Sequence, residues 1–310
     1  MCATERPVTE PLATDRPATD PPLVRGEPVE VADGVFVIPD RRVGAVPNVG
    51  IVVGDRAALV VDTGMGPRNG AYVLGWARRL AGERPLYLTL THFHPEHGFG
   101  AQEFKGAATI VYNTAQRDEL RRKGPAFLDM FRGFGPGIAA ELEGVELVDP
   151  DVTYDGRAEL DLGGRTAVLR AVGPAHTVGD QVVLVDDRVL FGGDLLETRM
   201  FPFTPYFPPF DTDGDPARWI TVLDELSALG PEIVVPGHGE VTDAGLIQEV
   251  HDYLAHVRDE TAHLRAAGAD ADATAATVEK NARARWATWD YPEWIGSTAR
   301  VFHRGGPDAA

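Results

Sequence analysis

The sequence predicts an α/β protein in which two β-sheets are covered by helices, followed by a C-terminal helical extension. From residue 29 onward, short β-branched runs bounded by turn residues recur in two groups, which is typical of strands. Segments with helical spacing follow some of these runs, and the pattern becomes helical after residue 242. Two strand groups with interspersed helices indicate a layered α/β sandwich. We therefore expect a sandwich domain over residues 29–245 and a helical extension over residues 246–310 that packs on it.

The N-terminal segment, residues 1–28, has a different composition. It holds six of the chain's 24 prolines, and Thr4, Thr9, Thr14 and Thr19 each precede an acidic residue. Such a segment buries too little apolar surface to offset the entropy lost on ordering. We expect a flexible tail, with a docking peptide as the alternative.

The individual elements follow from the same patterns. In the first group, strands are expected over residues 35–38, 50–53, 58–61, 86–90 and 109–112, and helices over residues 69–81 and 114–123. In the second group, strands are expected over residues 145–148, 167–172, 181–185, 189–191 and 233–235. Beyond them, an apolar stripe with helical spacing predicts a long helix; its members are Leu246, Val250, Tyr253, Leu254, Val257 and Leu264.

Composition excludes several classes of function. The 310 residues include 29 Lys plus Arg against 47 Asp plus Glu, so the formal net charge is −18, and a chain this acidic repels nucleic acid and anionic lipid. The single cysteine, Cys2, cannot form an internal disulfide. The N-terminus has no apolar signal region, and no apolar run approaches the length of a membrane span. We expect a soluble cytoplasmic protein with no nucleic-acid or membrane partner.

One short segment concentrates the residues that bind metals. His92, His94, Glu96 and His97 lie within six residues, directly after the apolar run 86–90. Two histidines spaced by two at a strand end point to one side, and the turn opened by Pro95 can bring Glu96 and His97 to an adjacent position. A single histidine is more often structural than functional, but this density indicates a metal site.

Three further candidates, His176, Asp194 and His238, share one local setting. Each follows an apolar run and stands near glycine, where backbone can approach a ligand closely. Any one of them alone could be structural. Their repetition in the same setting favours a common site.

These motifs resemble the signature of the metallo-β-lactamase superfamily, in which His-x-His-x-Asp-His is followed by a His, an Asp and a last His, with an Asp-x-Gly turn upstream. The resemblance implies a four-layer αβ/βα sandwich with two metal ions at the sheet edges. It implies that His92, His94 and His176 bind one ion, that Glu96, His97 and His238 bind the second, and that Asp194 bridges them. Asp62, in the Asp62-Thr63-Gly64 turn, would orient ligands by hydrogen bonding. This chain departs from the signature at Glu96, whose extra methylene moves the carboxylate by roughly 1.5 Å.

Imidazole and carboxylate ligands suit two divalent ions, zinc first, with iron or manganese as alternatives. Such ions would hold a bridging water and activate it as hydroxide, with Asp194 and Glu96 as the proton-handling catalytic residues. We expect hydrolysis of an ester, thioester, lactone or amide bond in a small, largely apolar organic metabolite. The alternatives are an iron-dependent oxygenase or other redox enzyme on the same scaffold, and a non-catalytic metal-binding protein.

Two segments give clues to the substrate. Residues 117–138 and 200–210 are rich in apolar aromatic side chains, so they either form pocket walls or simply pack on the sandwich. The first segment also holds the one dense group of basic residues, namely Arg117, Arg121, Arg122, Lys123 and Arg132. This group either steers an anionic substrate or an acidic carrier protein, or is a solvated helix face. Whether the chain forms a homodimer is left open.

Overall fold

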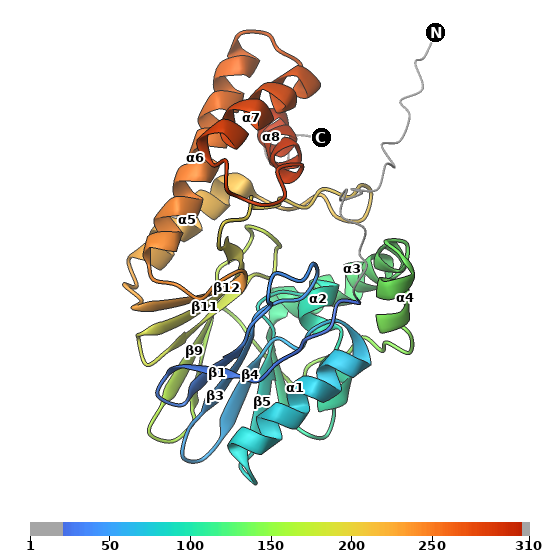
Figure 1. The fold of residues 1–310 in the computed structure, drawn as a ribbon, viewed down its shortest axis with the longest axis vertical. Helices are drawn as coiled ribbons and strands as arrows, with labels where there is room; N and C mark the ends of the chain where they lie inside the picture. Colours follow the sequence, from blue (N-terminus) through green and yellow to red (C-terminus); the bar gives the residue numbers. More distant parts are fainter. Residues whose placement is uncertain (1–20, 306–310) are drawn as a thin grey trace.

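A computed structural model describes residues 21–305 of the chain. The two sheets lie together in the lower half of Figure 1, and the C-terminal helices stand together at the top of that view. Residues 1–20 of the expected tail and residues 306–310 of the expected extension lie outside the described residues. In this part of the chain, none of the helices is both long enough and apolar enough to cross a membrane. The cytoplasmic location stays a prediction.

The first sheet has seven strands that neighbour one another in chain order: β1 (Val29–Ala32), β2 (Val35–Ile38), β3 (Val49–Val53), β4 (Ala58–Val61), β5 (Leu86–Thr89), β6 (Thr109–Asn113) and β7 (Val152–Tyr154). Strands β1 to β4 pair antiparallel, and β4 to β7 pair parallel. Parallel pairing requires a crossover, and helices supply it. The carboxyl ends of β4 and β5 therefore meet at one edge of the sheet.

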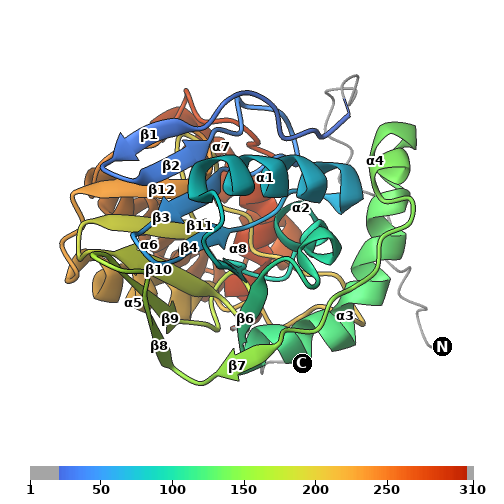
Figure 2. The ribbon, with the colours of Figure 1, turned by 90° about the horizontal axis from the view of Figure 1, so that it is seen from below.

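The crossovers of the first sheet are helical. Helix α1 (Gly66–Ala81) joins β4 to β5, and α2 (Pro95–Gly98) with the short helix η1 (Ala101–Phe104) joins β5 to β6. Helices α3 (Thr114–Arg132) and α4 (Pro136–Glu141) precede β7. In Figure 2, α3 lies next to β6 and β7, and α4 lies at the side of the molecule, where it contacts α3 and α1.

The second sheet has five strands in the order β12-β11-β10-β9-β8. They are β8 (Arg157–Asp161), β9 (Thr166–Ala171), β10 (Gln181–Val185), β11 (Val189–Glu197) and β12 (Ile233–His238). All neighbours pair antiparallel except β11 and β12, which are parallel and joined through α5 (Pro216–Ser227). The carboxyl ends of β11 and β12 therefore also lie together.

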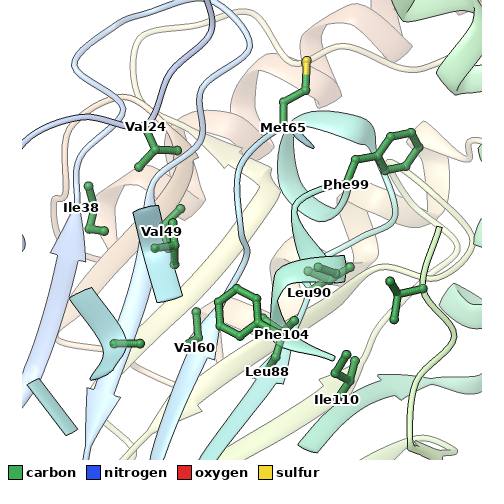
Figure 3. Close-up of a cluster of buried hydrophobic side chains, with 14 of the residues drawn as sticks. Val24, Ile38, Val49, Val60, Met65, Leu88, Leu90, Phe99, Phe104 and Ile110 are labelled. Carbon is green, nitrogen blue, oxygen red and sulfur yellow. The ribbon is translucent and has the colours of Figure 1, made fainter. Parts of the chain in front are cut away.

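Alternation along the strands produces four layers. Val60 faces the helix-covered side of the first sheet, where it lies with Leu88 and Phe104 in a buried apolar cluster (Figure 3). The neighbouring Val61 faces the other way, into a cluster shared with Val183 and other residues of the second sheet. A third cluster joins the second sheet to the C-terminal helices. The order helix, sheet, sheet, helix confirms the expected αβ/βα sandwich.

The C-terminal extension consists of α6 (Gly245–Ala266), α7 (Ala271–Arg285) and α8 (Trp294–Arg304). The apolar stripe predicted for α6 is buried at Leu246, Val250 and Tyr253, and α6 contacts α5 and β11. Helix α8 packs against both α6 and α7. Helices α5 and α6 thus lie on the outer face of the second sheet, and α7 and α8 pack on α6.

Three expectations differ from the structure. Residues 145–148 form no strand, and the edge positions of the two sheets are taken by β7 and β8 instead. Helix α3 runs to Arg132, through Pro125. Residues 22–24 pack against α1 rather than belonging to a flexible tail, because the buried Val24 donates its backbone N–H to the side chain of Asn69, 2.7 Å away.

Candidate metal centre

The histidine-rich segment changes conformation at Pro95. His94 is extended, with φ −59° and ψ 151°, because a residue before proline is disfavoured in the helical region. Pro95 then begins α2, and this short helix carries Glu96 and His97. The strand end therefore supplies His92 and His94, and the helix supplies the other two side chains, as the sequence predicts.

Glycines allow the second half of the chain to approach this segment. A Cβ on Gly193 would lie 2.6 Å from the Cβ of Thr91, and one on Gly237 would lie 2.0 Å from Oδ1 of Asp194. Both separations are shorter than real contacts, so side chains are excluded at these positions. Asp194 and His238, which follow these glycines on the parallel strands β11 and β12, can therefore reach the ends of β4 and β5.

The structure brings all seven predicted ligand residues into two adjoining groups. The first contains His92, His94, His176 and Asp194, and the second contains Glu96, His97, Asp194 and His238. Within each group, the candidate ligand atoms all lie within 4.8 Å of one another. Nδ1 of His94 lies 3.1 Å from Nε2 of both His92 and His176. Each group could hold one metal ion.

Asp194 belongs to both groups through different oxygen atoms. Its Oδ2 lies 3.7 Å from Nε2 of His92 and 3.8 Å from Nε2 of His176. Its Oδ1 lies 3.1 Å from Nε2 of His97 and 3.6 Å from Nε2 of His238. One carboxylate thus presents an oxygen to each group, which is the arrangement of a bridging ligand.

Backbone carbonyls fix the tautomers of two imidazoles. Nδ1 of His176 donates to the carbonyl oxygen of Phe203, and Nδ1 of His238 donates to that of Val46, each at 2.9 Å. Since a carbonyl oxygen only accepts, Nδ1 carries the proton in both rings. Nε2 of a neutral ring then has a free lone pair directed at the site.

Asp62 fixes the orientation of His97. It lies directly after β4 with a positive φ of 68°, a conformation that Asp tolerates better than most residues. Oδ1 accepts from the backbone N–H of Thr91 at 2.7 Å, and Oδ2 accepts from the Thr91 hydroxyl and from Nδ1 of His97, both at 2.9 Å. This is the orienting position expected for Asp62.

Unpaired polar atoms gather in the second group. Glu96 Oε2, His97 Nε2 and Asp194 Oδ1 are each buried without a hydrogen-bond partner. A buried polar atom without a partner costs roughly 1–3 kcal/mol. Three such atoms converging on one point fit a bound cation, which would ligate all three. The longer side chain of Glu96 therefore does not keep its carboxylate out of the group.

Burial and neighbouring charges set the protonation of the imidazoles. Burial lowers the pKa of His92 and His94 well below the usual value, and lowers the pKa of His176 to about 4. These rings are neutral at pH 7, as metal ligation requires. Burial also acts to lower the pKa of His97, but the carboxylates of Asp194 and Asp62 together raise it well above the usual value. A divalent ion on Nε2 of His97 would replace the proton held there.

Sequence reasoning missed Glu197, the last residue of β11. Its side chain is buried beside the second group, Oε2 has no hydrogen-bond partner, and its register partner across the sheet is His238. Burial and the carboxylate of Asp194 raise its pKa well above the usual value. The available signal in the sequence was an acidic residue directly after the apolar pair that follows Asp194, in Asp194-Leu195-Leu196-Glu197.

The group of basic residues is not an open cationic surface. Lys123 is fully buried, and its Nζ donates to Glu119, Asp211 and Asp213. Carboxylates also pair with the other four members, as follows: Arg117 with Asp118, Arg121 with Asp149, Arg122 with Asp213, and Arg132 with Asp129. Each of the five cations therefore has a carboxylate partner, and the steering of an anionic substrate or an acidic carrier protein stays a prediction.

The strand ends of the two sheets carry two adjoining groups of histidines and carboxylates. The protein is therefore an α/β sandwich protein with a candidate site for two divalent metal ions. Residues 42–238 match the family model described as the metallo-beta-lactamase superfamily. The chain belongs to this superfamily, as its motifs predict.

Two curated relatives are similar to the chain. A linear primary-alkylsulfatase of Pseudomonas sp. (strain ATCC 19151) is 25% identical over 240 residues, which are 66% of this chain and 44% of that protein. The acyl-coenzyme A thioesterase MBLAC2 of Gallus gallus is 28% identical over 226 residues, which are 67% of this chain and 78% of that protein. The chain thus spans less than half the length of the alkylsulfatase.

Solved structures show the same fold. The sec-alkylsulfatase Pisa1 from Pseudomonas sp. aligns with a TM-score of 0.70 at 15% identity, over 90% of this chain and 50% of that one. A metallo-beta-lactamase from Pontibacter korlensis aligns with a TM-score of 0.55 at 17% identity, over 74% of this chain and 98% of that one. The matched relatives are hydrolases of this fold, so the expected enzyme class is confirmed at the level of the family.

Proposed function

We propose that the protein is a hydrolase that depends on two divalent metal ions, most simply zinc. The observation that carries this proposal is the gathering of buried ligand atoms of Glu96, His97 and Asp194, next to the trio His92, His94 and His176. Without a metal ion, Oε2 of Glu96 would remain a buried acceptor with no partner, at a cost of roughly 1–3 kcal/mol.

Each side chain has a distinct task. His92, His94 and His176 hold one ion, Glu96, His97 and His238 hold the other, and Asp194 is shared. When bound, the ions supply a water of lowered pKa and an electrophile for the bond under attack. The protein fixes the ligands by the hydrogen bonds from His97, His176 and His238 to Asp62 and backbone carbonyls.

Proton transfer falls to the carboxylates. We assign the role of proton acceptor to Asp194, because it is the carboxylate common to both ligand groups and would lie next to a nucleophile supplied there. Glu96 has two carboxylate oxygens, so one can ligate an ion while the other passes a proton to the leaving group. The bond cleaved is an ester, thioester, lactone or amide in a small, largely apolar organic metabolite. The thioesterase and alkylsulfatase activities named for the relatives support an ester-type bond.

The test combines metal analysis with turnover. Protein purified without added metal is analysed for transition metals, and then assayed on a panel of carboxylic esters, thioesters, lactones, sulfate esters and β-lactams. We expect about two equivalents of zinc and hydrolysis of at least one class. His94→Ala should lose metal and turnover, whereas the matched change His303→Ala, on α8, should keep both.

Other outcomes would contradict the proposal in distinct ways. Less than half an equivalent of any transition metal in the purified protein would refute the proposed metal site. Stoichiometric iron with oxygen uptake and no hydrolysis would favour a redox enzyme. Bound metal with no turnover of any substrate class would favour a non-catalytic protein.

A further inference from the structure

We propose that aromatic side chains of residues 127–134, in α3 and just after it, and of residues 200–213 form the binding surface for an alkyl or acyl chain of the substrate, and that Lys123 positions this surface. The inference rests on the proposed function and specifies its substrate class. The surface is defined by Phe127, Phe131, Phe134, Phe207 and Phe210, and is called the phenyl surface below.

The phenyl surface begins at a candidate metal ligand. The ring of Phe127 stacks on the imidazole of His94 with centroids 4.9 Å apart and an interplanar angle of 28°. Phe131 follows at 6.2 Å from Phe127, and Phe134 at 4.9 Å from Phe131. Phe127 is buried, Phe131 is half-buried, and Phe134 is 38% exposed. The three rings therefore form a row that leads from the metal centre to solvent.

Residues 200–213, called the loop below, supply a second set of rings. Phe207 and Phe210 stand edge-on to Phe127, with centroids 5.9 and 5.7 Å away, and stack on each other at 6.2 Å. Both are only partly buried. The two sets of rings thus meet around Phe127, which stacks on His94, and apolar rings favour methylene groups over charged or sugar groups. An elongated row fits a flexible hydrocarbon chain whose cleavable end lies at the metals.

A buried lysine holds the loop in this place. Nζ of Lys123, on α3, donates to Glu119 at 2.5 Å, to Asp211 at 2.7 Å and to Asp213. Asp211 follows the loop ring of Phe210 directly in sequence. All three protons of the ammonium group are thus used, and two of the bonds cross from α3 to the loop.

The same lysine is linked to a metal ligand. Glu119 uses its second oxygen to accept the backbone N–H of Gly179, at 2.5 Å, in the loop that carries His176. Replacing Lys123 by an apolar residue would leave the buried carboxylates of Glu119 and Asp211 without their cation, which is strongly unfavourable, while Asp213 would keep only Arg122. The loop would then separate from α3, and the two sets of rings would no longer face one ligand. Lys123 is therefore a positioning residue.

The first experiment measures chain-length preference. Kinetics on 4-nitrophenyl butyrate and 4-nitrophenyl decanoate are compared for wild type, Phe131→Ala and Phe210→Ala, with Phe302→Ala on α8 as the matched control. We expect KM for decanoate to rise about tenfold in the first two variants, while KM for butyrate and the metal content stay within about twofold. Phe302→Ala should match wild type for both esters. Equal KM changes for the two esters, or none, would overturn the inference while leaving the proposed function intact.

The second experiment does not depend on turnover. Binding of decanoate to metal-free protein is measured by equilibrium dialysis, so a failure of the proposed hydrolysis would not affect it. We expect binding to weaken about tenfold in Phe131→Ala and Lys123→Met but not in Arg121→Met, which removes an exposed cation from the same helix. Wild-type affinity in folded Lys123→Met would refute its positioning role. Wild-type affinity in Phe131→Ala, or no binding by wild type, would refute the phenyl surface itself.

Discussion

The change Asp62→Asn should weaken one metal site and spare the other. Asparagine has nearly the same shape as aspartate and also tolerates the positive φ of 68° at this position. Its amide oxygen can keep the bond from the backbone of Thr91. Its NH₂ group, however, replaces the oxygen that accepts from Nδ1 of His97. Two donors then face each other, and His97 must either turn away or move its proton to Nε2.

The size of this effect follows from the lost hydrogen bond. A bond to a charged acceptor contributes about 1.5–3 kcal/mol, and 1.4 kcal/mol corresponds to a factor of ten. Loss of a partner that orients a ligating histidine typically costs 10–100-fold in metal affinity. We therefore expect zinc to bind about 10–100-fold more weakly at the group that contains His97. The group of His92, His94 and His176 should change little, because Asp62 accepts no hydrogen bond from these rings.

The assay is competition for zinc with a chromophoric chelator at pH 7, accompanied by circular dichroism to confirm folding. Asp155→Asn, a change at an exposed carboxylate, is the control and should match wild type. Two sites with wild-type affinity in folded Asp62→Asn would refute the reasoning. So would equal weakening of both sites, because it would mean that Asp62 acts on the whole centre.

Three further predictions concern packing, pH and metal removal. Gly237→Ala should lower the free energy of unfolding by more than about 2 kcal/mol and release metal, because its Cβ would lie 2.0 Å from Asp194 Oδ1. Gly75→Ala, in α1, should raise the free energy of unfolding by about 0.5–1 kcal/mol, because a Cβ there would have no atom within 4 Å. Equal urea midpoints for the two variants would contradict both expectations. Burial raises the pKa of Asp180 to about 8, so the folded state keeps a proton that the unfolded state releases near pH 4. The contribution of Asp180 to the free energy of unfolding is therefore complete below about pH 4, and it falls by about 1.4 kcal/mol per pH unit up to about pH 8. An asparagine side chain does not titrate, so the free energy of unfolding of Asp180→Asn relative to wild type should increase with pH. Urea unfolding of metal-free protein measures this difference. Chelation of two ions, each present at about 1,000 times its dissociation constant, should cost about 4 kcal/mol per ion and lower Tm by roughly 6 °C per ion in calorimetry; an unchanged Tm would argue against bound metal.

The interior of the sandwich was the most predictable part of the fold. Strands such as β4 and β10 are buried on both faces, and they read as continuous apolar runs in the sequence. Edge strands were harder to predict. In β8, Arg157, Glu159 and Asp161 are exposed, so the strand has no apolar run. Residues 145–148 were predicted as a strand but form none. Val148 is buried because it packs in the apolar cluster on the helix-covered side of the first sheet.

The candidate ligand residues that the structure brings together were predictable from the dense segment at residues 92–97 and from the resemblance to the superfamily signature. Ion pairs and burial that depend on distant parts of the chain could not be predicted. The partners of Arg121 and Arg122 are Asp149 and Asp213, 28 and 91 residues further on, so the sequence around α3 looked unpaired. Glu197 was overlooked because its importance comes from burial beside Asp194. Helix α3 was predicted too short because Pro125 is tolerated within it.

Each sheet is built from one continuous half of the chain, with β1 to β7 before Gly156 and β8 to β12 after it. The ligand residues divide in the same way. Each group draws two members from either half, and neither half alone holds a complete group. A bound ion would therefore act as a reversible cross-link between the two halves of the chain, at the edge where the two sheets meet. Two separately produced fragments, divided at the turn between β7 and β8, would regain a metal site only by docking, so metal uptake would report their reassembly.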